Sequence, residues 1–222
     1  APSLKHTTPA PPLRGSHANA AKLGCDFGHN RFRAPVMGSA VATPLISMAD
    51  YLQAEESGPI RHEYAAAYLF AMPGGSKHHA RISLNVAKAL DTAASDEGCA
   101  TYVADMRVRV SEVVYYPDVM VVCENDAPTH YTEVPRLIAE VLSESTERID
   151  RGEKLYNYRQ IGTLLNYLLI AQDRVHVDLY RRKGSAWLLE TYVNLDDEIA
   201  LDCPSCSLPL KHIYQQVEFD QP

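Results

Sequence analysis

Two carboxylates and a lysine are the residues of this sequence best suited to chemistry. Asp118 lies in the apolar run of residues 115–122, Glu140 lies in the run of residues 137–142, and Lys154 follows. Runs this rich in Val, Ile, Leu and Tyr are typical of strands buried on both faces, where an unpaired acid loses its hydration without compensation. Two such acids on neighbouring strands repel each other unless a divalent cation lies between them, and Mg²⁺ prefers carboxylate oxygens. The pattern therefore indicates a cation site, although two unrelated acids at strand ends would share the same spacing.

The elements that must hold these residues follow from the periodicity of the chain. Residues 49–56 predict a short helix, and residues 63–72 predict an irregular hairpin. Ser76 is expected to cap a long helix that runs to about Ala94. A second helix is expected over residues 147–161, and strands are expected over residues 102–110, 115–122, 136–142, 164–171, 175–181 and 186–193. This order of helix, three strands, helix and strand predicts an α/β fold, with one mixed central sheet flanked by helices and extra strands.

Length and composition favour one soluble domain with a tail. The 222 residues and the apolar content of 46% suit a domain of about 170 residues that buries a sizeable core. No apolar run reaches the roughly 18 residues that cross a bilayer, and the start lacks a signal-peptide pattern. We therefore expect no membrane contact and a cytoplasmic protein.

Five cysteines in distant segments are unlike a secreted disulfide framework and indicate a reduced chain. The motif Cys203-Pro-Ser-Cys206 has the spacing of half a zinc site, but no second pair exists, so loop cysteines without chemistry are expected.

Charge divides the chain near residue 47. Residues 1–47 carry five basic residues and one acid, whereas the rest carries 16 basic and 27 acidic residues and a net charge of −11. The first segment lacks strand or helix periodicity and is predicted to be disordered. It is a transit peptide, a DNA-contacting arm, or sequence upstream of a start at Met37 or Met48; we favour the last because no amphipathic helix is evident. The acidic body would repel DNA except at local basic patches.

Several segments together resemble a known family. They are, in chain order, MADYLQAEE, RHEY, SKHHARI, DMRVRV, YYPDVMVV, LIAEVLSESTERIDRGEKLYNYR and SLPLKHIY. Over residues 48–217 the chain resembles the restriction-endonuclease-like superfamily with the PD-(D/E)xK signature, and within it the Uma-two family of endonucleases. The resemblance implies a restriction-endonuclease-like domain over residues 48–222.

The same resemblance implies a metal-dependent hydrolysis of DNA. Asp118 and Glu140 would bind Mg²⁺ or Mn²⁺, with the backbone carbonyl of Val141 as a further ligand. The metal would orient water, lower its pKa and stabilise charge on a phosphodiester oxygen. Lys154 would hold or activate the attacking water and offset negative charge.

The lysine departs from the general superfamily pattern, which has a lysine two residues after the second acid, where this chain has Leu142. The family pattern suggests that Lys154 reaches the site from the next helix. Asp150, Lys154 and Tyr158 are spaced by four residues and share a helix face. Without the resemblance, an ordinary Asp-Lys surface pair explains this row.

Four further residues are candidates for accessory roles. Glu63 matches an acid that the family carries before its first long helix, but a solvent-facing strand carboxylate fits as well. His79 is expected on the side of the helix that faces the cleft, where it contacts phosphate or a carboxylate that lies behind the metal ligands, or has no role. Asp105 is either an outer acid of the site or a turn residue, and we favour the turn. Ser143 could bind phosphate, whereas helix capping explains Ser145 or Thr146.

Other polar and aromatic residues have simpler interpretations. Arg107 and Arg109 are candidate contacts to a nucleic-acid backbone, although solvated charge is more usual for such a strand face. Tyr156 and Tyr158 fit core packing better than base stacking.

Two functions remain open at this stage. The first is a divalent-metal endonuclease acting on DNA, and the second is a non-catalytic relative that keeps the fold for binding or assembly. The acidic body and the displaced lysine favour the second function. A Ser-His-Asp hydrolase is disfavoured because no GxSxG motif is present. A homodimer is an expectation from the symmetry of double-strand cleavage alone.

Overall fold

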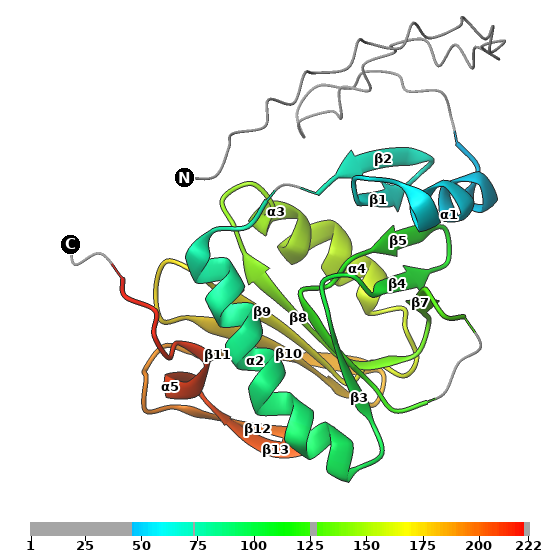
Figure 1. Cartoon of the computed structure of the whole chain (residues 1–222). Coiled ribbons are helices and arrows are strands. Elements are labelled where there is room, and N and C mark those ends of the chain that lie inside the picture. The colour runs from blue at the N-terminus through cyan, green and yellow to red at the C-terminus, as the bar shows by residue number, and fades with distance from the viewer. Residues whose placement is uncertain (1–45, 73, 125–127, 220–222) are drawn as a thin grey trace, which may run out of the picture. The chain divides into compact units, whose positions relative to one another are not determined.

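A six-stranded mixed sheet forms the centre of the computed structural model, which describes residues 46–72, 74–124 and 128–219 (Figure 1). In spatial order its strands are β11 (Ala186–Tyr192), β10 (Val177–Lys183), β9 (Asn166–Ala171), β8 (Pro135–Leu142), β6 (Val119–Val122) and β3 (Ala100–Val103). Strands β8 and β9 run parallel, and the other neighbours are antiparallel. The predicted mixed sheet is thus confirmed, whereas the prediction for residues 1–47 lies outside the described residues except at Ile46 and Ser47.

A second, five-stranded sheet was not predicted. Its strands, in spatial order, are β2 (Tyr68–Ala71), β1 (His62–Ala65), β5 (Val113–Tyr115), β4 (Arg107–Val110) and β7 (Tyr131–Thr132). The sequence analysis also missed a hairpin of β12 (Glu198–Asp202) and β13 (Ser205–Pro209) and the short helix α5 (Leu210–Ile213). These late elements pack against the long helix and cover one face of the central sheet.

At two places where the chain passes between the two sheets, the sequence predicted one uninterrupted strand. The predicted strand over residues 102–110 is interrupted by a turn at residues 104–106, so that β3 and β4 belong to different sheets. The predicted strand over residues 115–122 is likewise divided between β5 and β6, with Pro117 between them. Proline has no N–H for a strand ladder, which explains the second interruption. Asp118 therefore lies where the chain crosses from one sheet to the other.

The helices agree with the predictions apart from one. Helix α1 (Met48–Ser57) is capped by Ser47, and helix α2 (Lys77–Asp96) is capped by the Ser76 hydroxyl, which accepts the His79 N–H at 3.0 Å. The predicted helix over residues 147–161 ends at Tyr158 instead, and it consists of α3 (Glu147–Ile149), a π-helical turn (Asp150–Lys154) and α4 (Leu155–Tyr158). Such π turns are uncommon and often lie at functional sites.

The alternation of side chains along the central strands builds a core on each face of the sheet. In β6, Val119 and Val121 pack against α2, whereas Met120 packs on the opposite face with the helix of residues 147–158. In β8, Ile138 and Leu142 belong to that second face. Glu140, two residues from each, must point to the same face and hence toward the helix that carries Lys154.

The predicted hairpin of residues 63–72 is confirmed as β1 and β2, which pair from His62↔Ala71 to Ala65↔Tyr68. Its two turn residues, Ala66 and Ala67, have φ of 49° and 68°. Two-residue hairpin turns with positive φ at both positions favour Asn and Gly, so alanines are strained here.

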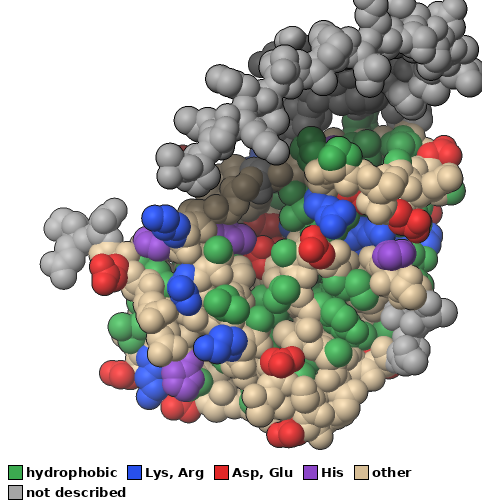
Figure 2. All heavy atoms as spheres, viewed as in Figure 1, with side chains coloured by type: hydrophobic (Ala, Val, Ile, Leu, Met, Phe, Trp, Pro, Cys, Tyr) green, Lys and Arg blue, Asp and Glu red, His purple; other side chains and the backbone are tan. Residues whose placement is uncertain are grey.

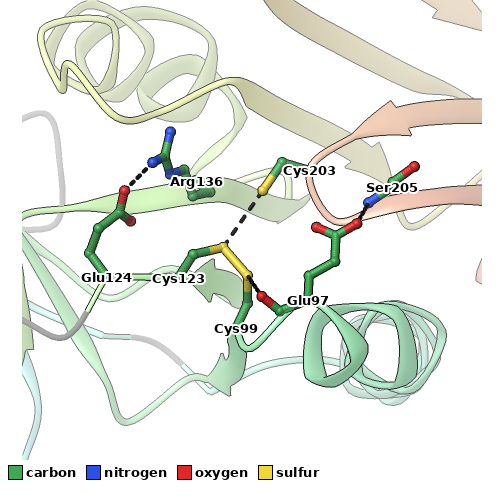
Figure 3. The surroundings of a disulfide bond; sticks show 7 residues. All are labelled: Glu97, Cys99, Cys123, Glu124, Arg136, Cys203 and Ser205. Atoms are coloured by element: carbon green, nitrogen blue, oxygen red, sulfur yellow. Dashed lines mark hydrogen bonds and ion pairs between the residues drawn. A yellow bond between two sulfur atoms is a disulfide. The ribbon is translucent and has the colours of Figure 1, made fainter.

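The prediction that all cysteines are reduced is wrong for one pair. Cys99 and Cys123 form a disulfide with an S–S distance of 2.08 Å, and Cys203 lies beside it as a free thiol (Figure 3). Cys206 is also a free thiol. No sign of this pair was visible in the sequence, because the two cysteines are far apart along the chain. They meet because β3 pairs with β6, and Cys99 and Cys123 directly flank the paired residues Ala100 and Val122. No helix among the described residues is long and apolar enough to span a bilayer.

Candidate active site

Asp118 is held at the start of β6 by contacts from two other elements. The backbone N–H of Val141 in β8 donates a hydrogen bond to Asp118 Oδ2 at 2.7 Å. His79 Nε2, from the first turn of α2, lies 3.2 Å from the same oxygen. Burial lowers the pKa of His79, but the hydrogen bond and the charge of Asp118 outweigh it and raise this pKa above its usual value. The carboxylate that His79 contacts is thus Asp118, one of the two predicted metal ligands, and not an acid behind them.

Glu140 lies in the middle of β8 and is buried, with 3% of its surface exposed. Its Oε1 accepts a hydrogen bond from the Tyr158 hydroxyl at 2.9 Å and lies 3.2 Å from Lys154 Nζ. Burial raises the pKa of Glu140 well above its usual value, and the nearby Asp150 and Asp118 carboxylates add to this while Lys154 opposes it. An additional positive charge would therefore stabilise the ionised form.

Lys154 lies at the end of the π-helical turn, and its buried ammonium is surrounded by three carboxylates. Nζ is 3.0 Å from Glu63 Oε1 and 3.2 Å from both Glu140 Oε1 and Asp150 Oδ1. Burial favours the neutral amine, but the three acids outweigh it and raise the pKa of Lys154 well above its usual value. The side chain is thus a fixed positive charge.

Glu63 and Asp150 complete this acidic cluster. The Tyr116 N–H donates to Glu63 Oε1 at 3.3 Å, which fixes the β1 carboxylate beside the crossing between the sheets. The Tyr167 hydroxyl donates to the backbone carbonyl of Asp150 at 3.0 Å. Asp150 was not among the predicted site residues, because its four-residue spacing from Lys154 indicated only a shared helix face.

Three tyrosines form the apolar wall beneath the cluster. The Tyr158 ring packs edge-on against Tyr115 and Tyr167, with centroid distances of 5.5 Å and 5.1 Å. The core position predicted for Tyr158 is confirmed, but its hydroxyl also contacts Glu140. The core position predicted for Tyr156 is wrong, because Tyr156 is 72% exposed.

Two predicted accessory residues lie elsewhere or are otherwise engaged. The Asp105 side chain is 83% exposed in the turn between β3 and β4 and pairs with Arg61 at 3.3 Å. The Ser143 hydroxyl accepts the Thr146 N–H at 3.2 Å, so Ser143, and neither Ser145 nor Thr146, satisfies this helix start.

The arginines of β4 differ from each other. Arg107 is buried and its Nε donates to the His130 carbonyl at 2.9 Å, contrary to the expectation of solvated charge. Arg109 is partly exposed, stacks over Tyr131 and lies 3.6 Å from Glu133. Arg109 thus remains the more accessible of the two.

The carboxylates of Asp118 and Glu140 suit a divalent cation. Each uses one oxygen for the protein contacts above, and no described residue donates a hydrogen bond to Asp118 Oδ1 or Glu140 Oε2. Four carboxylates, those of residues 63, 118, 140 and 150, face one ammonium and one imidazole, an excess of negative charge that a cation would offset. Within the described part of the chain, these acids form no group of three ligand atoms within 4.8 Å of one another. Mg²⁺ does not require three close protein ligands, because it is commonly bound by one or two carboxylates and keeps several waters.

Comparison with known proteins gives a family and a fold. The Uma2 family, described as "Putative restriction endonuclease", matches residues 48–211. Two proteins of Synechocystis sp. (strain PCC 6803) are similar over most of their length. "Uncharacterized protein slr1290" is 33% identical over 181 residues, which cover 79% of this chain and 95% of that protein. "Uncharacterized protein sll1609" is 35% identical over 164 residues, which cover 71% and 93%.

A solved structure shares the fold. The crystal structure of a "putative nuclease belonging to DUF820" from Anabaena variabilis ATCC 29413 matches with a TM-score of 0.65 and 16% sequence identity. The match covers 78% of this chain and 99% of that chain. Together with the mixed sheet and its flanking helices, this match confirms the predicted fold class.

Proposed function

The chain belongs to the Uma2 family, and on this premise we propose that it is a divalent-metal-dependent endonuclease that hydrolyses phosphodiester bonds in DNA. One observation carries the proposal: Asp118, Glu140 and Lys154 come together from β6, β8 and the following helix. Lys154 Nζ lies 3.2 Å from Glu140, and Asp118 accepts the N–H of the residue that follows Glu140. Burying two carboxylates and an ammonium is costly, so unrelated acids at strand ends would not be expected to form this cluster.

Asp118 and Glu140 would hold Mg²⁺ or Mn²⁺ through their unengaged oxygens, with the Val141 carbonyl as a further ligand. When bound, the cation supplies a water of lowered pKa and offsets the charge that develops on the phosphodiester. The protein orients both carboxylates beforehand, through Val141 N–H and His79 for Asp118 and through Tyr158 for Glu140.

Lys154 would act as a charge and a hydrogen-bond donor. Because its pKa is raised, the amine keeps its proton at neutral pH and cannot accept one from water. Its three carboxylate partners hold the ammonium in a fixed position. The ammonium would therefore orient the attacking water and stabilise negative charge on the substrate.

The test is cleavage of supercoiled plasmid by the full chain with Mg²⁺ or Mn²⁺. Removing one metal-binding carboxylate in Asp118→Asn or Glu140→Gln is expected to lower the cleavage rate by at least about 100-fold. Asp105→Asn is the matched control, because this exposed acid pairs only with Arg61, and it should cleave like the wild type.

Two outcomes would contradict the proposal. Cleavage that persists in Asp118→Asn would come from a contaminant and would remove the site assignment. A folded wild-type chain that cleaves no DNA with either metal would favour the binding or assembly module, in which Lys154 serves only to neutralise buried acids.

A further inference from the structure

Three cysteines from separate segments meet at the end of α2 away from the acidic cluster. Cys99 follows α2, Cys123 follows β6, and Cys203 lies in the turn between β12 and β13. The Cys203 Sγ is 3.6 Å from the Cys123 Sγ, which is itself bonded to Cys99. Figure 3 shows the Cys203 side chain pointing at the disulfide. Across the described ranges, these sulfurs are the only three His, Cys, Asp or Glu ligand atoms within 4.8 Å of one another.

The turn that carries Cys203 is fixed against the helix end. The Ser205 N–H donates to the carboxylate of Glu97, the residue that directly follows α2, at 2.8 Å (Figure 3). Cys99 is anchored on the same helix end, because its N–H donates to the Ala94 carbonyl at 2.8 Å. The free thiol is thus held beside the disulfide by contacts that do not involve sulfur.

We propose that Cys99, Cys123 and Cys203 form a thiol–disulfide exchange site, in which Cys203 and Cys99 compete for Cys123. The Cys203 thiol releases its proton to solvent, and the thiolate attacks the Cys123 sulfur. The Cys123–Cys203 bond forms as the Cys99–Cys123 bond breaks, and Cys99 leaves as a thiolate that takes a proton from solvent. The exchange conserves electrons, so it needs no oxidant or reductant.

The surroundings of Cys203 make this exchange slow at neutral pH. Burial raises the pKa of the Cys203 thiol, the Glu97 and Glu124 carboxylates add to this, and Arg136 opposes it. These three groups face the thiol from the end of α2, the segment after β6, and β8. Because the thiolate is the attacking species, the exchange rate is expected to rise with pH.

The two disulfides cross-link different parts of the fold. Cys99–Cys123 joins residues 24 apart in sequence, next to the paired strands β3 and β6. Cys123–Cys203 would join residues 80 apart and would tether the β12–β13 hairpin to the central sheet. The exchange therefore changes which element is covalently linked to β6, the strand that begins directly after Asp118.

Disulfide mapping tests the proposal. The full chain, prepared without reductant, is incubated at several pH values, quenched with acid, alkylated with N-ethylmaleimide and digested for mass spectrometry without reduction. We expect both linkages, with the Cys123–Cys203 fraction growing faster at higher pH. Cys203→Ser should show Cys99–Cys123 alone, and Cys206→Ser, which removes the other free thiol of the same hairpin, should behave like the wild type.

Cys99→Ser provides a second measurement that does not depend on the exchange rate. This variant also carries Cys25→Ser, which removes a thiol outside the described residues. A small-molecule disulfide oxidant should then link Cys123 to Cys203. A thermal melt of the same variant checks that the fold is kept. Complete alkylation of Cys203 beside an unchanged Cys99–Cys123 bond, even at alkaline pH, would overturn the proposal. So would a purified chain that lacks the disulfide and holds one zinc ion on these sulfurs.

Discussion

Lys154 lies next to Glu140 although it comes from the following helix, whereas the superfamily pattern that the sequence resembles has a lysine two residues after the second acid. The side chain at that position, Leu142, is buried and packs in the core beneath the helix. An ammonium there would have to displace this packing. The same charge is supplied from the helix, where the π-helical turn directs Lys154 to within 3.2 Å of Glu140. The sequence alone could place this lysine near the site only through the resemblance, since four-residue spacing does not distinguish a surface pair from a buried one.

The raised pKa of Glu140 predicts that this carboxylate destabilises the metal-free fold. A group whose pKa is raised on folding stabilises the folded state below its unfolded pKa, and this contribution is lost as the pH rises through its folded pKa. In the metal-free state, Glu140→Gln should therefore raise the free energy of unfolding at pH 7 to 8, by an amount on the order of 1 kcal/mol. The gain should disappear below about pH 4, where carboxyls are protonated in both states.

Urea denaturation with EDTA at several pH values measures this effect. Glutamine keeps the oxygen that accepts the Tyr158 hydrogen bond, and Lys154 retains Glu63 and Asp150. Asp105→Asn, at an exposed carboxylate, is the control and should leave stability unchanged. A Glu140→Gln variant that is less stable at pH 8 would mean that the ion pair with Lys154 outweighs the cost of burial.

At the scale of elements, periodicity predicted the existence of most helices and strands but not their partners. The alternating pattern of residues 102–110 and the apolar run of residues 115–122 each extend across a point where the chain changes sheets, so pattern alone predicted one strand in each place. Pro117 was a visible signal of the second interruption, whereas the turn at residues 104–106 has no proline or glycine. The π-helical turn was not predictable either, because the spacing of its apolar residues is compatible with an ordinary α-helix.

Gly152 tests what the π-helical turn requires. It lies within the turn, and a Cβ added there would meet no atom within 4 Å. Gly152→Ala is therefore expected to stabilise the fold by about 0.5 to 1 kcal/mol, because alanine loses less backbone entropy on folding. Chemical denaturation measures the change, and plasmid cleavage should be unaffected. A loss of stability or of cleavage would indicate that the turn depends on the conformational freedom of glycine.

At the scale of the whole molecule, the candidate site depends on both sheets. Glu63 comes from the five-stranded sheet, Glu140 from the six-stranded sheet, and Lys154 from the helix that connects the parallel strands β8 and β9. No local segment could therefore show the full constellation. Sequence analysis found its members through the family resemblance, and it missed Asp150 because a single four-residue spacing did not identify a third acid of the cluster.

At the scale of the whole molecule, the first 47 residues carry a net positive charge and residues 48–222, the body of the chain, carry a net negative charge. The body has a net charge of −11, and on the face in Figure 2 basic and acidic side chains intermix without one continuous basic patch. Long-range attraction to DNA must then come from local groups or from the five basic residues of the first segment. These two sources can be separated by shortening the chain.

A chain that begins at Ile46 should keep the fold but bind DNA less tightly. Ile46 supplies the carbonyl that accepts the Tyr64 hydroxyl at 3.0 Å, and Ser47 caps α1, so the melting temperature is expected to be unchanged. Without the basic segment the net charge falls from −7 to −11. The affinity for duplex DNA, measured by fluorescence anisotropy in EDTA, should drop about tenfold near 50 mM salt, and the difference should narrow toward 200 mM because phosphate contacts weaken with salt.

A full-length chain with all five of these basic residues changed to glutamine is the matched control, and it should reproduce the loss without changing chain length. The residues are Lys5, Arg14, Lys22, Arg31 and Arg33. Unchanged affinity in both proteins would exclude a DNA-contacting arm. A loss in the shortened chain alone would assign the effect to the segment's length instead of its charge.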